Sequence, residues 1–479
     1  MLTGSEMAVV DANAAALGVP RKQLMESSGH ALAREIREHV DPGATVTVVA
    51  GRGNNGGDAL VAARFLDAYD LRTCLLGRPE TITTDIAREN WDALGRAEYP
   101  TEQVRDSTSF GLADPDLVVD AMLGTGIAGD LREPAATAAR AMNDSDATVL
   151  SVDVPSGLDA ETGTLAETAV DADHVVTFHD TKPGLDDLDA TVTVADIGIP
   201  DAAELFVERG DLLRLDRDPA SHKGDNGEVL IVGGGPYTGA PALAAQSALR
   251  GGADLVRVAC PERIAREIQG YSENLIVLPY DGDRLAPEHV DWLADRADAH
   301  DTLVLGPGLG DADETLDAVA ELLGRFDGTA VVDADALQVV PEVDTDADLL
   351  CTPHQGELLG MGGETSDDWR ERTDLVESFA AELGVTLLVK GPYDIVSDGD
   401  RTRVGRTGNP GMTVGGTGDV LAGLTGALAC VQAPLDAAAL GAYANGAAGD
   451  RVVDDRGNGL VATDLLDAIP TVLWGGADD

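Results

Sequence analysis

At 479 residues the chain is long enough for two or three domains, and a 44% share of hydrophobic residues is typical of globular proteins. The 33 basic and 85 acidic residues give a net charge of −52, which would repel nucleic acid and anionic membranes and excludes both as expected partners. No uninterrupted apolar run is long enough to span a bilayer, and the N-terminus MLTGSEMAVVDANAAALG lacks the basic start of a secretory signal, so we expect a cytoplasmic protein.

The acidic residues are interspersed with apolar residues along the whole chain, and lysine is almost absent. The only lysines are Lys22, Lys182, Lys223 and Lys390. Acid enrichment with few lysines is typical of proteins dissolved in molar salt, where the Debye length shrinks to about 3 Å and charge repulsion is screened. We therefore interpret the charge as the solvent adaptation of a halophile. The lysines that remain in the glycine-flanked motifs TKPG, HKGD and VKGP are candidates for roles that arginine cannot take.

The first half of the chain predicts an α/β domain. Residues 5–39 predict two helices with a break at 17–20, and the β-branched run 45–50 predicts a buried parallel strand. This strand leads into the loop GRGNNGGD (51–58) and then into a helical pattern. Strand, glycine loop and helix in this order form the phosphate-binding arrangement of a doubly wound sheet. We therefore predict a Rossmann-like domain over residues 1–212.

Two more predicted strands of this half end in polar glycine loops. Residues 117–122 lead into LGTGIAGD (123–130), and residues 148–152 lead into DVPSGLD (153–159). The carboxyl ends of parallel strands meet at one edge of a sheet, so Asn55, Asp120 and Ser156 could share a site, and their oxygen ligands suit a hard cation. The alternative is that Asp120 and Asp153 only cap their loops.

These motifs, together with Leu24-Met25-Glu26 and the turn Thr181-Lys182-Pro183-Gly184, resemble the NAD(P)H-hydrate epimerase family over this half. The resemblance implies that Asn55, Asp120 and Ser156 ligate potassium. It also implies that Asp153 and Lys182 are the catalytic pair, because an acid and an amine facing one pocket can exchange protons at the hydroxylated ring carbon. The residues implied to bind the hydrate are Asn54, Asn55, Gly56, Gly57, Asp58, Gly124, Thr125, Gly126, Ile127, Ala128, Gly129, Asp130 and Asp153.

The second half predicts another α/β domain, over residues 220–479, after a linker at about residues 211–221. Strands and the loops that follow them are predicted in the stretches 228–232, 255–260, 302–310, 330–337, 348–358 and 386–396, with a small-residue helix at 240–251. Polar candidates again follow the strands. Asp333 and Asp335 hold waters around a magnesium ion or only cap the next helix, and His354 is either a ligand contact or structural. Lys390 is well placed as a point charge against phosphate.

The densest glycine segment of the chain is GNPGMTVGGTGD, residues 408–419, which runs into an apolar helical pattern. Its backbone N–H groups and the positive end of the following helix dipole predict an anion site. A carboxylate beside a bound phosphate is a poor phosphate ligand, so Asp419 is a candidate base that takes a proton from a substrate hydroxyl. The alternative is that Asp419 is an acidic N-cap.

HKGDNG, GPGLG, DADAL, TPHQGE, VKG and GNPGMTVGGTGD, in this order, resemble the ADP/ATP-dependent NAD(P)H-hydrate dehydratases of the ribokinase-like superfamily. The resemblance implies that Asp419 is the catalytic base. Contacts with the hydrate are implied for Ala240, Gly308, Gly310, His354 and Asp419. Contacts with the nucleotide are implied for Lys390, Gly391, Pro392, Tyr393, Asp394, Gly415, Gly416 and Gly418.

Together the two halves resemble the bifunctional hydrate repair enzymes. The implied function is interconversion of the R and S forms of hydrated NADH and NADPH, followed by dehydration of the S form at the expense of ADP, which gives AMP and phosphate. The implied cofactors are K⁺ in the first domain and Mg²⁺ with ADP in the second, and a homo-oligomer is expected. Two alternatives stay open: a ribokinase-like vitamin or sugar kinase, and a first domain that is a non-catalytic binding module.

Overall fold

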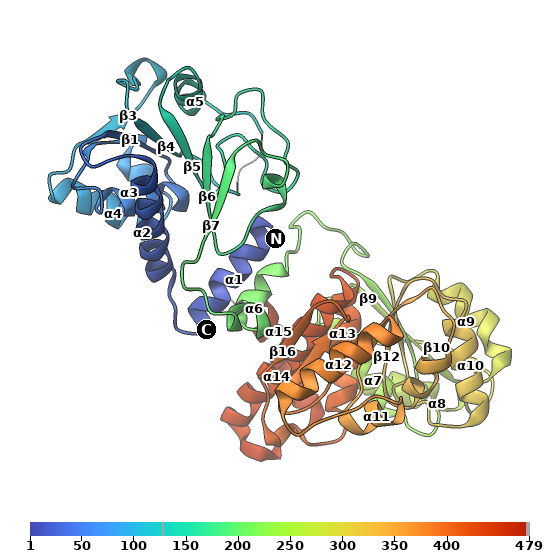
Figure 1. The fold of residues 1–479 in the computed structure, drawn as a ribbon. Helices are drawn as coiled ribbons and strands as arrows, with labels where there is room; N and C mark the ends of the chain where they lie inside the picture. The colour runs from blue at the N-terminus through green and yellow to red at the C-terminus, as the bar shows by residue number, and fades with distance from the viewer. Residues whose placement is uncertain (127–128, 476–479) are drawn as a thin grey trace. The chain divides into compact units, whose positions relative to one another are not determined.

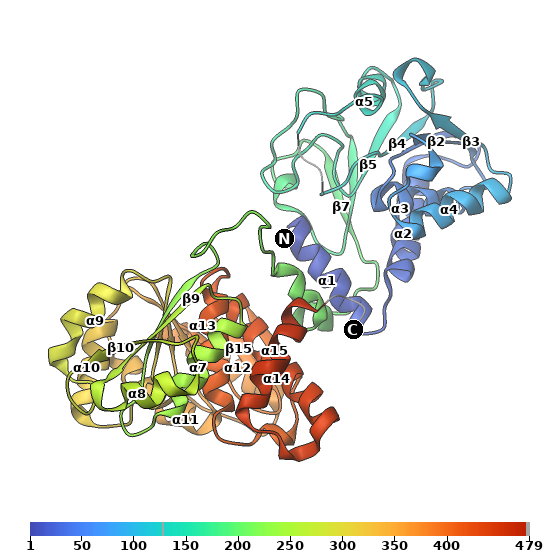
Figure 2. The same cartoon turned by 180° about the vertical axis from the view of Figure 1, so that it is seen from behind.

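The structure, a computed structural model, describes residues 1–126 and 129–475. The chain forms two compact units, Met1–Ala203 and Glu204–Asp479, and each is described by itself. The short helix α6 (Ala202–Leu205) lies where the chain passes from one unit to the next. Figures 1 and 2 show the chain from opposite sides.

The first unit is built on a seven-stranded parallel sheet with the order β3-β2-β1-β4-β5-β6-β7. The strand order reverses between β1 and β4, and ligands of doubly wound sheets bind at such a reversal. The strands that the sequence predicts at 45–50, 117–122 and 148–152 are confirmed. The strands are β1 (Thr45–Ala50), β2 (Asp70–Leu76), β3 (Thr101–Val104), β4 (Leu117–Ala121), β5 (Thr148–Val152), β6 (His174–Phe178) and β7 (Thr191–Ala195).

Helices cover both faces of this sheet. α1, α2, α3 and α4 bury their apolar side chains against one face, and α5 packs against the other (Figure 1). α1 begins with a capping box between Thr3 and Glu6, and it ends before the predicted break at 17–20. The helices are α1 (Gly4–Ala16), α2 (Arg21–His39), α3 (Asn54–Ala63), α4 (Asp85–Arg96) and α5 (Ala135–Asn143).

The second unit contains a nine-stranded sheet with the order β10-β9-β8-β11-β12-β13-β14-β15-β16. All neighbouring strands are parallel up to β14, and β15 is antiparallel to both of its neighbours, β14 and β16. The predicted two-domain α/β class is thereby confirmed. The strands are β8 (Glu228–Val232), β9 (Leu255–Pro261), β10 (Ile276–Tyr280), β11 (Thr302–Leu305), β12 (Thr329–Val332), β13 (Asp348–Cys351), β14 (Thr386–Val389), β15 (Asp394–Ser397) and β16 (Thr402–Gly405).

The two faces of this second sheet carry separate apolar clusters. One cluster is formed by α7, α13, α14 and α15, and the other by α9, α10 and α12. α8 buries two residues and α11 buries one. The helices are α7 (Gly239–Arg250), α8 (Glu262–Tyr271), α9 (Val290–Ala297), α10 (Asp313–Leu323), α11 (Gln355–Gly360), α12 (Trp369–Leu383), α13 (Thr417–Ala429), α14 (Pro434–Arg456) and α15 (Ala462–Trp474).

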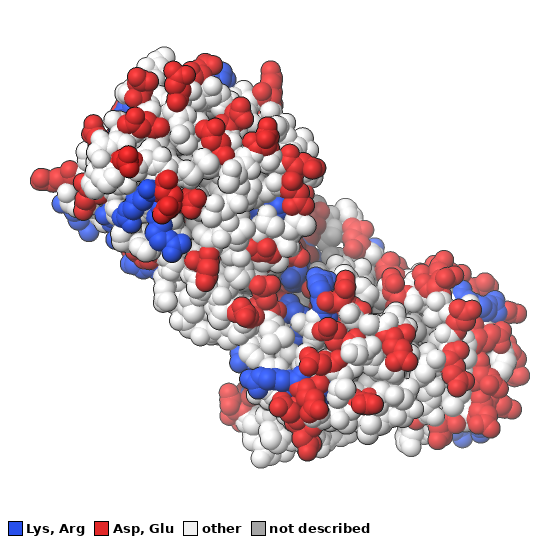
Figure 3. All heavy atoms as spheres, in the orientation of Figure 1, with Lys and Arg blue, Asp and Glu red and all other residues white. Residues whose placement is uncertain are grey.

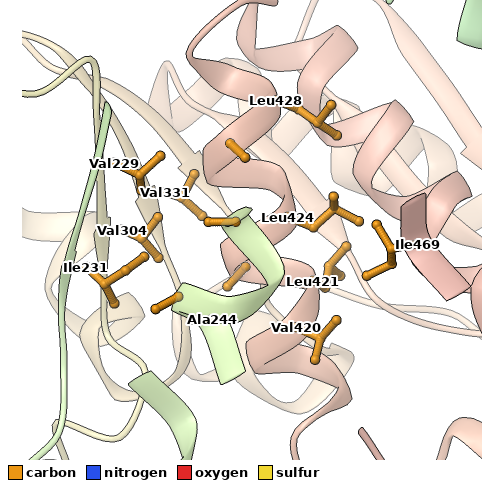
Figure 4. Packing of buried hydrophobic residues seen from close by; sticks show 14 of the residues in the cluster. Val229, Ile231, Ala244, Val304, Val331, Val420, Leu421, Leu424, Leu428 and Ile469 are labelled. Atoms are coloured by element: carbon orange, nitrogen blue, oxygen red, sulfur yellow. The ribbon is translucent and has the colours of Figure 1, made fainter. Parts of the chain in front are cut away.

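α13 packs unusually closely on α7 and on the sheet. A Cβ added to Gly423 would lie 1.9 Å from the carbonyl oxygen of Ala244 in α7, and a Cβ on Gly426 would lie 2.4 Å from Val304 Cγ2. Val420, Leu421, Leu424 and Leu428 of α13 are buried in the cluster that contains Ala244 and the strand residues (Figure 4). Only glycine permits this approach, and it fixes the start of α13, where Asp419 lies.

Acidic side chains outnumber lysine and arginine on the visible surface of both units (Figure 3). Many of the arginines pair with carboxylates; Arg217, for example, lies 2.5 Å from Asp254. Among the helices of the described chain, none is both long and apolar enough to cross a membrane.

Candidate active sites

In the first unit, Asn55, Asp120 and Ser156 lie together where β1, β4 and β5 end. Ser156 donates its hydroxyl to Asp120 Oδ1 at 2.6 Å and its backbone N–H to Asp120 Oδ2 at 2.8 Å. Leu123 completes the group, because its carbonyl accepts from Asn55 Nδ2 at 2.7 Å and its N–H donates to Ser156 Oγ at 3.0 Å. The three side chains therefore lie close together, as a shared site would require. Asp120 also holds the loop after β4, since it accepts from the backbone N–H of Met122.

The donor set fits a monovalent cation. Asn55 Oδ1 is buried and accepts no hydrogen bond among the described residues, so a lone pair there is unused. Asp120 is completely buried, and burial raises the pKa of its carboxyl while the hydrogen bonds from Ser156 lower it. Within the described ranges no group of three or more His, Cys, Asp or Glu side chains could hold a metal. One carboxylate with neutral oxygens matches a single positive charge better than a divalent ion.

The predicted catalytic pair, Asp153 and Lys182, is formed. Lys182 Nζ lies 3.3 Å from Asp153 Oδ1, and the lysine side chain is only 1% exposed. Its ammonium also donates to the carbonyls of Phe178 and Asp180 and to Thr177 Oγ1, whose hydroxyl donates in turn to Asp153. Thr177 could not be predicted from the sequence, because a threonine inside a β-branched strand gives no signal beyond strand propensity.

Further carboxylates surround this pair. Burial raises the pKa of Asp58 well above its ordinary value, with a contribution from the negative charge of Asp153, and burial likewise raises the pKa of Asp11. Asp11, in α1, was also missed by the sequence analysis, because a single acid in a helix of an acidic protein is indistinguishable from a solvated one. The other predicted residues of the first loop begin α3, with Asn54 exposed and Gly56 and Gly57 buried.

The glycine loop after β4 borders a cavity of about 430 Å³. The lining residues are Gly4, Ser5, Thr125, Gly126, Asp159, Ala160 and Glu161. Gly124 approaches the site, because a Cβ there would lie 3.2 Å from Asn55 Cβ. Gly129 and Asp130 are exposed, and Asp130 accepts from the backbone N–H of Glu167 rather than joining Asp153. Ile127 and Ala128, also predicted to bind the hydrate, lie outside the described residues.

In the second unit a charged cluster forms around Lys390 at the end of β14. Lys390 Nζ lies 3.1 Å from Asp333 Oδ1 and 3.6 Å from Glu357 Oε2. Burial alone would lower the pKa of Lys390, but Asp333, Glu357 and Asp419 raise it, so the ammonium is retained. Asp333 is buried and accepts from Thr352 Oγ1 at 2.7 Å, and it makes no side-chain capping hydrogen bond. It therefore positions Lys390 rather than capping a helix.

Asp419 lies in the same cluster. The N-cap of α13 is Gly416, with φ +97° and no side-chain cap, so the alternative that Asp419 is the N-cap is wrong. Burial and the negative charge of Asp333 raise the pKa of Asp419 to about 7, against an opposing effect of Lys390. A carboxyl with a pKa near neutrality is suited to accept a proton.

No side chain caps the first N–H groups of α13, and glycines lie on both sides of its first residue, Thr417. A Cβ on Gly418 would lie 3.6 Å from Lys390 Nζ, whereas a Cβ on Gly415 would have no neighbour within 4 Å. Asp450 holds the start of the segment by accepting from the N–H of Gly408 and from Asn409 Nδ2. The positive helix end and the Lys390 ammonium therefore face the same place, as an anion site requires.

The turn Lys390–Asp394 is stabilised by a hydrogen bond between two of its own residues. Asp394 Oδ1 accepts from the N–H of Gly391 at 2.8 Å, and burial raises the pKa of Asp394 to about 7. The ring of Tyr393 stacks on Trp369 with centroids 5.0 Å apart. Gly391 and Pro392 are exposed, so their backbone is open to a ligand.

The remaining residues predicted to contact the hydrate lie in two separate places of the second unit. Ala240 and Gly308 meet, because a Cβ on Gly308 would lie 3.2 Å from Ala240 Cβ, and Gly310 lies against Pro236. His354 begins α11 in a capping box with Glu357, which also contacts Lys390. Both places lie next to the cluster around Lys390 and Asp419. His354 reaches it through Glu357. Ala240 reaches it through α7, because a Cβ on Gly416 would lie 2.7 Å from Cδ1 of Leu243, one turn after Ala240.

The fold and these residues define a two-domain α/β enzyme, with an Asp153–Lys182 pair in the first unit and a charged cluster around Lys390 in the second. The family models agree: residues 21–184 match one described as YjeF-related protein N-terminus, and residues 229–471 match one described as NAD(P)H-hydrate dehydratase. The chain is 44% identical to a bifunctional NAD(P)H-hydrate repair enzyme of Methanothermobacter thermautotrophicus, over 98% of this chain and 94% of that protein. It is 43% identical to one of Pyrobaculum aerophilum, over 98% of both chains. The chain belongs to the family of bifunctional NAD(P)H-hydrate repair enzymes.

A solved structure supports the fold of the second unit. A hypothetical protein from Streptococcus mutans, SMU.573, superposes with a TM-score of 0.50 at 21% identity. The match covers 56% of this chain and 98% of that one. At this identity the likeness concerns the fold alone.

Proposed function

We propose that the chain repairs hydrated nicotinamide cofactors in two steps. Residues 1–212 interconvert the R and S forms of hydrated NADH and NADPH, and residues 220–479 dehydrate the S form at the expense of ADP, giving AMP and phosphate. Relatives that align over 98% of the chain are bifunctional NAD(P)H-hydrate repair enzymes, which supports this proposal. The observation that carries it is the carboxyl of Asp419, with its pKa raised to about 7 beside Lys390 and the open start of α13.

In the first unit, epimerisation inverts the ring carbon that carries the hydroxyl. Loss and return of this hydroxyl need a group that protonates it and a group that takes the proton back, and Asp153 and Lys182 are linked through Thr177 in a way that allows both. The loops Asn54–Asp58 and Gly124–Asp130 are proposed to hold the hydrate. Burial of the Lys182 side chain keeps bulk water from its ammonium, where water would otherwise compete for the proton.

In the second unit, dehydration faces a poor leaving group, since hydroxide leaves a carbon with difficulty. Asp419 takes the proton of the ring hydroxyl, whose oxygen then forms a bond to the terminal phosphorus of ADP while the bond to AMP breaks. The ring nitrogen then supplies the electron pair that expels phosphate, and loss of a proton from the neighbouring carbon restores the double bond. Ala240, Gly308, Gly310 and His354 are proposed to hold the hydrate.

The nucleotide is proposed to lie against Lys390, the turn up to Asp394, and Gly415, Gly416 and Gly418. The Lys390 ammonium and the N–H groups of α13 neutralise phosphate charge. Asp333 and Asp335 are proposed to hold Mg²⁺, which when bound neutralises the charge of the phosphates. Burial, Asp311 and Glu357 raise the pKa of Asp335, which indicates more negative charge here than Lys390 alone balances.

Three further features belong to the proposal. Asn55, Asp120 and Ser156 ligate K⁺, supported by the unused oxygen of Asn55. The net charge of −52 with four lysines reflects adaptation to molar salt. The enzyme is a homo-oligomer, which light scattering in concentrated KCl tests directly.

Separated hydrate epimers test the function. The chain is added with ADP and then with ATP, and both epimers, free phosphate and the restored NADH absorbance are followed. Loss of both epimers with equal amounts of phosphate and NADH is expected. A stable phosphorylated product with no NADH would instead identify a small-molecule kinase, and loss of the S form alone would make the first unit a non-catalytic module.

A further inference from the structure

An exposed tyrosine stands beside the glycine loops of the second unit. Tyr237 is 63% exposed, although aromatic residues make up only 4% of the chain and the charged side chains of the visible surface are mostly acidic (Figure 3). An exposed aromatic ring orders water around apolar surface and adds nothing to the solubility that the acidic side chains provide. Solvation therefore gives no reason for a large ring at this position.

The backbone of Tyr237 forms part of the wall at the strand ends. Its carbonyl oxygen lies 3.2 Å from the position of a Cβ on Gly308 and 3.4 Å from that of a Cβ on Gly234. Gly308, with φ +74°, also meets Ala240. Tyr237 thus lies in the turn from β8 to α7, facing the loop after the adjacent parallel strand β11. Ligands of parallel α/β sheets bind at this end of the strands.

The turn is tied to α8 by a hydroxyl pair. Thr238 is the N-cap residue of α7, yet its side chain makes no capping hydrogen bond. Its hydroxyl lies 3.1 Å from the hydroxyl of Tyr271, the last residue of α8. In the described part of the chain, neither Tyr237 nor Tyr271 stacks on another aromatic ring. The turn is therefore held in place while the Tyr237 ring stays without a partner.

We propose that the ring of Tyr237 binds a planar nitrogen heterocycle of the hydrated dinucleotide by stacking. This inference rests on the proposed function and adds a substrate contact to the second unit. Stacking suits an uncharged ring on an acidic surface, because it needs no charge complementarity. The dinucleotide offers two such groups, the nicotinamide-derived ring and the adenine, and the chemistry of the contact is the same for both.

The substitution Tyr237→Ala, compared with Tyr237→Phe, tests the contact. For Y237A the KM for the S hydrate is expected to rise about tenfold with kcat nearly unchanged, and the KM for ADP stays at the wild-type value. Y237F keeps the ring and is expected to behave as wild type. Trp474→Ala is the matched control, because Trp474 is an exposed aromatic residue of the same unit, 43% exposed, at the end of α15.

Two substrates distinguish the two rings. Hydrated NADH carries both heterocycles, whereas hydrated, reduced nicotinamide mononucleotide lacks the adenine. A rise in KM for both substrates assigns the stacking to the nicotinamide-derived ring, and a rise for hydrated NADH alone assigns it to the adenine. Either result supports the inference.

Wild-type values of all constants in Y237A, or a rise confined to the KM for ADP, would overturn the inference. A Y237F defect as large as that of Y237A would also overturn it, because the hydroxyl would then be the contact. Failure of the proposed function is separate: in that case the wild-type chain itself does not dehydrate the S hydrate with ADP.

Discussion

Asp419→Asn is expected to inactivate dehydration and to stabilise the second unit at the same time. Burial and Asp333 raise the pKa of Asp419 from 3.8 to about 7, so the folded protein holds this carboxylate at a free-energy cost above that pH. A group with a raised pKa contributes stability below its ordinary pKa and loses that contribution as the pH rises through the folded value. Asparagine has a similar shape without the charge, and the cost disappears.

The size of the stabilisation follows from the rise in the pKa of Asp419. One pKa unit corresponds to about 1.4 kcal/mol, so a shift of roughly three units sets an upper limit of about 4 kcal/mol near pH 8. Two effects reduce this limit: Lys390 loses an anionic neighbour in the variant, and water reaches the half-buried side chain of residue 419. We therefore expect the free energy of unfolding to increase by about 2 kcal/mol. At about pH 5 wild-type Asp419 is mostly protonated. The stabilisation by the substitution is therefore expected to be less than about half of its value near pH 8.

Urea unfolding of wild type and D419N at several pH values measures the gain. Dehydration by D419N is expected to fall about 100-fold or more, the contribution of a general base. In the wild type, kcat/KM is expected to rise with pH up to about 7, because the base must be deprotonated. A variant that is less stable than wild type at pH 8, or a stability difference independent of pH, would refute the reasoning.

Three further predictions concern other residues. Lys182→Met is expected to lower epimerisation about 100-fold with dehydration of the S form unchanged, and an equal loss of both activities would contradict the assignment. Replacing KCl by NaCl at equal ionic strength is expected to lower the unfolding temperature of the wild type but not of Asn55→Ala; equal shifts would contradict the potassium site. Gly423→Ala is expected to destabilise the fold by about 3 kcal/mol. Gly270→Ala, in a helix with no atom within 4 Å of the added methyl group, is the control and should be neutral or slightly stabilising.

The local pattern of apolar and polar residues was enough to predict many of the strands. The β-branched run 45–50 is buried on both faces, so composition alone identifies it as a parallel strand, and its observed bounds match the prediction. The edge strands β3 and β16 carry half-exposed polar residues, and the pattern did not distinguish them from loops. Their pairing depends on contacts distant in sequence, which a local pattern does not contain.

The candidate sites likewise contain residues that the sequence predicts and residues that it does not. Glycines and carboxylates at strand ends were found because a parallel sheet brings these ends together, as for Asn55, Asp120 and Ser156. Thr177 and Asp11 were missed because their relation to Asp153 exists only in three dimensions. For Asp419, the sequence allowed either an N-cap or a base. The observed N-cap at Gly416 removes the first, since the helix begins at Thr417, three residues earlier than an N-cap at Asp419 would require.

The contact between Gly423 and Ala244 also limits how the second unit can move. Ser247 of α7 donates its hydroxyl to the carbonyl of Val420 at 2.6 Å, so the two helices are joined by a hydrogen bond as well as by close packing. Neither helix can slide past the other without separating this contact, and they should therefore move as one rigid body. Any opening that admits the nucleotide or releases AMP would then come from the loops after β12, β13 and β14, with Asp419 as the fixed reference point.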